Sequence, residues 1–245
     1  IDLKFKDPFK IAQKEKSHFL IKSLNLAHKI ALKNKIIGII NCPINKNLLI
    51  KPKTGITEYF ARKCNVKDNS EVMLINNKNV SVSPITTHLD LKEVPKKISK
   101  QLIINKVKTI NTNFIKLYKR KPKICILGLN PHNAELRKNS EEVKIIIPSI
   151  SILKKLKINI KGPFVADTIF IKDFKNFDVI VGMYHDQVLA PFKTLFEFDA
   201  INITLGLPYI RISPDHGVAV DKRKLNISSP KSLNNCLNVI TNLTK

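Results

Sequence analysis

Three of the six histidines each follow an apolar run that is typical of a β-strand. They are His88 in TTHLD, His132 in NPHNAE and His185 in MYHDQ. Neutral imidazoles from three separate loops, with one position left for substrate, form the ligand set that a catalytic divalent metal uses to polarise a substrate oxygen. The intervals of 44 and 53 residues match no short metal motif. Ordinary strand-end histidines, hydrogen-bonded to the backbone, are the alternative.

Two carboxylates lie close to these histidines in the chain. Asp186 directly follows His185, and Asp167 lies in the segment GPFVADT. Each is a candidate general acid or base, or a partner that orients a metal-bound imidazole. Asp167 suits a helix or turn cap equally well.

An anion site is a further candidate, carried by Lys193, Asn202 and Arg211. These residues follow one another at nine-residue intervals, and an arginine fork suits a carboxylate or phosphate. Among 43 basic residues, two can lie there by chance. The segment 203–217 contains two glycines and two prolines, which predicts a shaped loop or an ordinary turn. Neither a dinucleotide-binding GxGxxG, nor a P-loop, nor a GxSxG elbow occurs in the sequence.

Helices and strands alternate along the chain, which indicates an α/β protein. The predicted helices span 9–34, 94–119, 141–157 and 230–242. The predicted strands span 37–41, 71–75, 80–87, 123–129, 164–170, 177–184 and 201–206. Open α/β sheets bind ligands beyond the carboxyl ends of their strands, and His88, His132 and His185 all lie at such ends.

The composition excludes several classes of protein. A net charge of +24 raises the question of nucleic acid, but only five of the 43 basic residues are arginines, and the lysines are dispersed. We therefore expect no specific nucleic-acid partner. No apolar run is long enough to span a membrane, and no signal peptide is visible, so we expect a cytoplasmic protein. The four scattered cysteines predict reduced thiols.

Five segments taken together resemble the 4-hydroxythreonine-4-phosphate dehydrogenase family of pyridoxal phosphate biosynthesis. They are TTHLDLKEVP (86–95), LGLNPHNAE (127–135), GPFVADTIF (162–170), MYHDQVLAPFK (183–193) and NITLGLPYIRISPDHG (202–217). They occur in the family's order and nearly at its spacing, and they cover most of the chain. Several motifs in one order are more specific than any single motif, and they favour the metal site.

The resemblance implies an NAD-dependent oxidation that a divalent metal (Zn²⁺, Mg²⁺ or Co²⁺) assists. The 3-hydroxyl of 4-phosphooxy-L-threonine becomes a ketone, and the 3-oxo acid loses CO₂ to give 3-amino-2-oxopropyl phosphate. The implied roles are metal ligation by His88, His132 and His185; catalysis by Asp167 and Asp186; substrate binding by Thr57, Lys193, Asn202 and Arg211; and cofactor binding by His216 and Gly217.

The resemblance also implies a fold of two α/β/α domains, similar to the isocitrate and isopropylmalate dehydrogenases. Residues 1–40 and 206–245 would then be the remnant of a first, cofactor-side domain that is truncated at its N-terminus. Residues 41–205 would form the second domain, with the metal and substrate site. The family builds its site at a homodimer interface, so we expect a homodimer in which His185 is contributed across that interface.

The chain departs from the family pattern at four places. Gly-Ile-Thr-Glu at 55–58 replaces Gly-His-Thr-Glu, and NAELRKNSEE replaces a glycine-rich stretch after His132. VAVDKRKLN follows Gly217 where the family has small residues and glycines, and the family's opening Pro-Ala-Gly-Ile-Gly loop does not occur in this sequence. Two alternatives therefore stay open: a sibling dehydrogenase of a phosphorylated sugar acid, and a non-catalytic remnant of the family.

Overall fold

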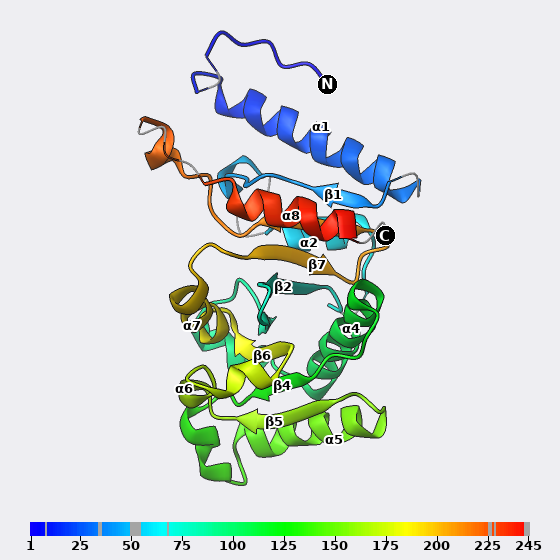
Figure 1. Cartoon of the computed structure of the whole chain (residues 1–245), viewed down its shortest axis with the longest axis vertical. Helices are drawn as coiled ribbons and strands as arrows, with labels where there is room; N and C mark the ends of the chain where they lie inside the picture. The colour runs from blue at the N-terminus through cyan, green and yellow to red at the C-terminus, as the bar shows by residue number, and fades with distance from the viewer. Residues whose placement is uncertain are drawn as a thin grey trace.

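The computed structural model describes residues 1–7, 9–33, 36–49, 55–67, 69–224, 227 and 229–242. The strands in these ranges form a single sheet in the order β1-β8-β7-β2-β3-β6-β4-β5. They are β1 (Gly38–Ile40), β2 (Val72–Asn76), β3 (Ser81–Thr86), β4 (Ile124–Leu127), β5 (Ile160–Phe164), β6 (Val179–Tyr184), β7 (Ile201–Leu205) and β8 (Ile210–Pro214). Figure 1 shows the sheet running from β1, beside α1, down to β5, beside α5.

The sheet is mixed, with a parallel half and a largely antiparallel half. Strands β3, β6, β4 and β5 run parallel to one another, whereas β2 pairs antiparallel with both β3 and β7, and β7 pairs antiparallel with β8. The parallel strands are joined through helices, as parallel connections require. The predicted α/β class is confirmed, and the predicted strands 71–75 and 80–87 correspond to β2 and β3, which pair with each other.

Helices cover both faces of the sheet. They are α1 (Gln13–Leu32), α2 (Ile56–Lys63), α3 (Val94–Lys97), α4 (Lys100–Tyr118), α5 (Ile147–Lys155), α6 (Ala166–Ile169), α7 (His185–Phe196) and α8 (Lys231–Asn242). Side chains of a strand alternate between the two faces, so Val72 and Leu74 join one apolar cluster, and Met73 and Ile75 join another. In Figure 1, α4 and α7 accordingly lie on opposite sides of the sheet.

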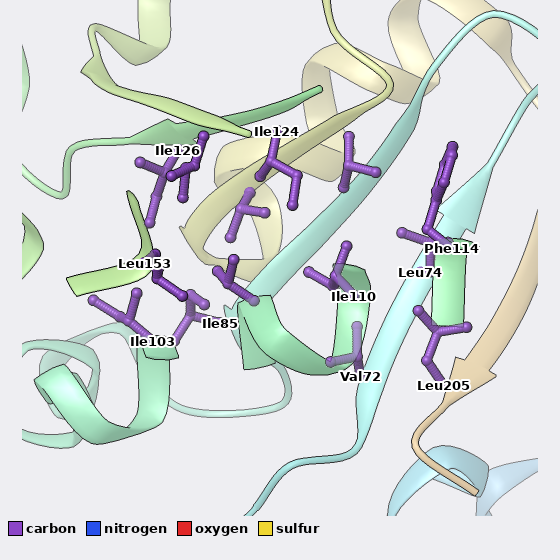
Figure 2. Close-up of a cluster of buried hydrophobic side chains, with 14 of the residues drawn as sticks. Val72, Leu74, Ile85, Ile103, Ile110, Phe114, Ile124, Ile126, Leu153 and Leu205 are labelled. Carbon is purple, nitrogen blue, oxygen red and sulfur yellow. The ribbon is translucent and has the colours of Figure 1, made fainter. Parts of the chain in front are cut away.

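The larger cluster lies under α4 and α5, and Figure 2 shows its side chains. Helix α4 contributes Ile103, Val107, Ile110 and Phe114, whose spacing of three to four residues places them on one stripe. Ser99 caps the N-terminus of the helix, because its hydroxyl accepts a hydrogen bond from the backbone N–H of Leu102. An apolar stripe that packs on β-branched strand residues therefore fixes the helix against the sheet.

An ion pair ties the entry of β4 to the entry of β6. Arg120 donates two hydrogen bonds to the Asp178 carboxylate, at 2.8 and 2.6 Å, and the backbone N–H of Lys123 donates a third at 2.7 Å. Burial alone would raise the pKa of Asp178, but the hydrogen bonds from Arg120 and Lys123 outweigh it and lower this pKa. The carboxylate is therefore better stabilised in the folded protein than in the unfolded chain.

Several sequence-based predictions are wrong in detail. The strand expected over 164–170 lies earlier, at β5, and residues 166–169 form the short helix α6. The loop expected over 203–217 contains β8, which was not predicted because a charged residue, Arg211, is buried at its second position. Helix α7 was not predicted, since Pro191 lies inside it and interrupts the expected pattern.

The predicted boundary between two domains stays a prediction. The strands assigned to the first domain, β1 and β8, lie in the same sheet as β2 to β7, which were assigned to the second. Each of the four cysteines lies in the described ranges, and each is a free thiol. Across these ranges, every helix is too short or too polar to cross a membrane.

Candidate functional site

His88 and His185 lie side by side at the carboxyl ends of two neighbouring strands. Strands β3 and β6 are parallel, and Thr86 is in register with Tyr184, so the residues that follow emerge together. The Thr86 hydroxyl donates to the Met183 carbonyl at 2.8 Å, which joins the two strand ends. The imidazole centroids of His88 and His185 are 5.8 Å apart. Two of the three predicted metal ligands are thus brought together within one chain.

Each of these two imidazoles contacts a carboxylate through Nδ1. The distance to Glu58 Oε1 is 3.3 Å for His88, and the distance to Asp186 Oδ1 is 2.7 Å for His185. An ionised carboxylate can only accept a hydrogen bond, so Nδ1 carries the proton and Nε2 carries the lone pair. Carboxylate partners of this kind orient metal-binding histidines in many proteins.

Glu58 is held tightly in the first turn of α2. The Thr87 hydroxyl donates to Glu58 Oε1 at 2.8 Å, and Oε2 is buried without a hydrogen-bond partner among the described residues. Burial alone would raise the pKa of Glu58, but hydrogen bonds from His88 and Thr87 outweigh it and lower this pKa to about 2. A Cβ on Gly55 would overlap Glu58 Oε2 and crowd the His88 ring, so these side chains would have to shift to accommodate it.

His132 lies on the loop after β4, next to a different carboxylate. Its Nε2 is 3.8 Å from Asp167 Oδ2, and its Nδ1 is 3.6 Å from Glu135 Oε1. Among the residues that the structure describes, no three His, Cys, Asp or Glu side chains are grouped closely enough to hold a metal ion. One chain therefore presents a pair of histidines, and the three-histidine site stays a prediction.

The loop that carries His132 adopts a left-handed turn. Residues 132–136 all have positive φ, between 44° and 55°. This conformation costs L-residues roughly 1–2 kcal/mol each, and glycine avoids the cost. The expectation of a glycine-rich stretch here thus has a physical basis, although the chain supplies other residues. Glu142 holds the start of the loop, because its carboxylate accepts 2.8 Å hydrogen bonds from the backbone N–H groups of Leu129 and Asn130.

A polar strip crosses the sheet face on which α2 and α7 lie. The strip consists of Asn202 and Thr204 on β7, together with Arg211 and Ser213 on β8. Cross-strand partners share a face, and the alternate residues of both strands point into the large apolar cluster on the other face. The strip separates the apolar cluster under α7 from the one between α1 and α2.

Arg211 is buried at 2% exposure, as is Thr204 of the same polar strip. Its guanidinium donates to Asn41 Oδ1 at 2.7 Å and to Thr204 Oγ1 at 3.1 Å. Thr57 Oγ1 lies 3.2 Å from Thr204 Oγ1, which brings α2 onto the same network. Burial lowers the pKa of Arg211 to about 10, which leaves it charged at neutral pH. Asn202 Oδ1 is buried without a hydrogen-bond partner among the described residues.

Lys193 lies on α7, and its side chain approaches the polar strip at the carboxyl end of β8, whereas Arg211 lies near the start of that strand. Its Nζ lies 2.7 Å from Asp215 Oδ2, just beyond the last residue of the strand. The predicted substrate residues Thr57, Asn202 and Arg211 therefore meet on the polar strip, and Lys193 approaches it as one half of an ion pair. Asp215, like Glu58, was not predicted as a site residue.

The predicted cofactor residues lie outside this network. His216 Nδ1 is 2.9 Å from the carbonyl oxygen of Gly217, and Gly217 is exposed, with open space where a Cβ would be. Ile56, which stands where the family has histidine, packs against the apolar cluster between α1 and α2. Part of the segment after Gly217 lies outside the described residues.

Comparisons with known proteins agree with one another. Residues 1–240 match the family model of the pyridoxal phosphate biosynthetic protein PdxA. A 4-hydroxythreonine-4-phosphate dehydrogenase from Sulfurihydrogenibium sp. is 41% identical over 91% of this chain and 70% of its own length. The enzyme of that name from Aquifex aeolicus is 40% identical over 87% of this chain and 67% of its length. The crystal structure of a 4-hydroxythreonine-4-phosphate dehydrogenase from Klebsiella pneumoniae is similar with a TM-score of 0.82 and 26% identity, over 100% of this chain and 77% of that one.

Proposed function

Because the chain belongs to the family of the pyridoxal phosphate biosynthetic protein PdxA, we propose that it acts as a 4-hydroxythreonine-4-phosphate dehydrogenase. In this reaction the C3–H of 4-phosphooxy-L-threonine leaves as hydride to NAD⁺, and the 3-hydroxyl proton is released. The resulting 3-oxo acid then breaks its bond to the carboxylate, releases CO₂ and takes up a proton, which yields 3-amino-2-oxopropyl phosphate.

The observation that best supports this proposal is the pair His88 and His185, each with a carboxylate on Nδ1. This donor set fits a divalent metal, because both rings keep their lone pair on Nε2. One chain brings His88 and His185 together, so in place of the expected His185 from a second copy we propose that His132 of a second copy completes the site in a homodimer. Bound there, a divalent metal would lower the pKa of the substrate hydroxyl and polarise the ketone.

The polar strip suits the anionic groups of this substrate. In the described residues, Arg211 donates its hydrogen bonds to the neutral acceptors of Asn41 and Thr204. A buried cation whose fork contacts only neutral acceptors is costly, and a phosphate or carboxylate that reaches this fork would offset that cost. Asn202 and Thr57 would orient the same group, while Lys193 would share its charge between the substrate and Asp215.

Two aspartates are the candidates for moving the hydroxyl proton. Asp186 contacts His185 and Asp167 approaches His132, and both side chains are more than half exposed. An exposed carboxylate next to a ligating imidazole can orient the ring and also exchange a proton with water. His216 and Gly217, beyond β8, would contribute to binding NAD.

The test measures NADH formation by the full-length protein with 4-phosphooxy-L-threonine. His185→Ala should abolish activity and weaken the binding of Zn²⁺. His18→Ala, which changes an exposed histidine on α1, should alter neither. Full activity of the His185→Ala variant would refute the assignment.

A sibling enzyme that oxidises a phosphorylated sugar acid is the second candidate, and Ile56 favours it. The side chain packs into an apolar cluster and offers a substrate no hydrogen bond. A polar substrate group left without its partner costs roughly 1–3 kcal/mol, or about 5- to 150-fold in binding. If Ile56→His raises activity on 4-phosphooxy-L-threonine alone, the first function holds. Activity on phosphorylated sugar acids alone supports the sibling enzyme. Lack of activity on every substrate, in both the wild type and Ile56→His, supports a non-catalytic remnant.

A further inference from the structure

We propose that Glu58 is a positioning residue that fixes the orientation and tautomer of His88, and that it thereby sets the affinity of the site for a divalent metal. The inference rests on the proposed function, since it takes His88 as a metal ligand. Glu58 itself need not touch the metal or the substrate.

The contacts of Glu58 converge on the start of the loop that carries His88. A single carboxylate oxygen, Oε1, accepts from the Thr87 hydroxyl at 2.8 Å and lies 3.3 Å from His88 Nδ1. Thr87 and His88 are neighbours in the chain, so the carboxylate holds the loop at two adjacent side chains. Rotation of the His88 ring about its own bonds would break the second of these contacts.

The carboxylate is presented by a firmly packed helix. Glu58 lies in the first turn of α2, where negative charge is favourable because the backbone N–H groups point toward it. Phe60 of the same helix is fully buried, and it packs with Tyr209 in the cluster between α1 and α2. The bare backbone of Gly55 leaves the space that the Glu58 carboxylate occupies. A site that is held from a rigid element keeps its geometry better than one on a mobile loop.

The Glu58 carboxylate also determines which ring nitrogen of His88 carries the proton. With a carboxylate on Nδ1, the His88 ring carries its lone pair on Nε2, the atom that can bind a metal. An amide at position 58 can instead offer an N–H group to Nδ1, which places the ring proton on Nε2. Metal binding would then require the proton to move first. Loss of such a partner usually weakens metal affinity about 10- to 100-fold.

A purely structural role is the competing explanation. Glu58 also lies close enough to the buried cations Arg211 and Lys106 for its charge to favour their protonated forms. Glu71 offers a matched control at Lys106, because its carboxylate lies 3.9 Å from Lys106 Nζ. If the charge balance at Lys106 alone matters, Glu71→Gln and Glu58→Gln should behave alike.

The experiment measures Zn²⁺ affinity of the full-length protein by competition with a chromophoric chelator, and the His88 tautomer by ¹⁵N NMR without metal. We expect Glu58→Gln to weaken Zn²⁺ binding about 10- to 100-fold. It should also move the His88 proton from Nδ1 to Nε2. Glu58→Asp, which keeps the charge, should restore part of the affinity, and Glu71→Gln should bind Zn²⁺ like the wild type.

Unchanged Zn²⁺ affinity and an unchanged tautomer in Glu58→Gln would overturn the inference. Equal losses in Glu58→Gln and Glu71→Gln would overturn it as well, in favour of the structural role. If the wild type binds no Zn²⁺ but the His88 tautomer still depends on Glu58, the metal site of the proposed function is refuted. The positioning of His88 by Glu58 is then still supported.

Discussion

Replacing Glu135 by glycine should stabilise the protein, although glycine usually destabilises a folded chain. Glu135 has a φ of 44°, within the left-handed turn that carries His132. Glycine adopts this conformation without the steric cost, so the substitution raises the free energy of unfolding by roughly 1–2 kcal/mol. The greater conformational freedom of glycine in the unfolded chain reduces this stabilisation by roughly 0.5–1 kcal/mol. The side chain is 71% exposed, so little burial is lost. We expect a net gain of about 0.5–1 kcal/mol.

Urea unfolding measures this gain, and the contact between His132 and Glu135 contributes little because both side chains are more than half exposed. The control is Lys154→Gly, which alters an exposed residue in the right-handed helix α5 and should cost about 1 kcal/mol. If both variants lose stability to the same extent, the left-handed turn carries no cost, and our account of the glycine-rich expectation is refuted.

Three further predictions concern the core, the pH dependence and the anion site. Ile110→Ala removes a fully buried side chain and should lower the free energy of unfolding by roughly 2–5 kcal/mol in urea titrations. Asp178 has a lowered pKa, so its contribution to stability is present above the unfolded pKa and lost as pH falls through the folded value. Asp178→Asn should therefore destabilise at neutral pH and flatten the acid limb of a pH series of melting curves. Arg211→Lys keeps the charge but loses the fork, and it should raise the KM for the phosphorylated substrate far more than the KM for NAD, whereas equal changes would argue against substrate binding.

The sequence revealed most of the strands that position the site. Apolar runs such as 177–184 and 123–129 are buried on both faces of the sheet, and their continuous hydrophobicity made them easy to find. Helix α4 was visible from its apolar stripe. Strand β8 was not, because a buried charge at Arg211 breaks the pattern that identifies a strand, and its burial depends on partners distant in the chain.

Only some residues of the candidate site could be predicted from the sequence. His88 and His185 were found because each follows a strand, and the register of β3 with β6 then brings them together. Glu58 was missed as a partner of His88, since only the packing of α2 shows the contact. The sequence offered one indication of Glu58, because the predicted substrate residue Thr57 directly precedes it in the four-residue motif 55–58. Asp215 was missed for the same reason, although it directly precedes His216.

The position of β6 between β3 and β4 has a consequence for the order of folding. During synthesis β3 and β4 leave the ribosome first, and β6 follows only after α5 and β5. The two earlier strands cannot close on each other without occupying the place of β6, and loop closure over so long a segment is slow. A nascent chain that stops before Val179 therefore exposes the edges of β3 and β4 that would pair with β6, together with the edge of β2 that would pair with β7. Such edges invite pairing with other chains, so truncated products should aggregate rather than persist as soluble fragments.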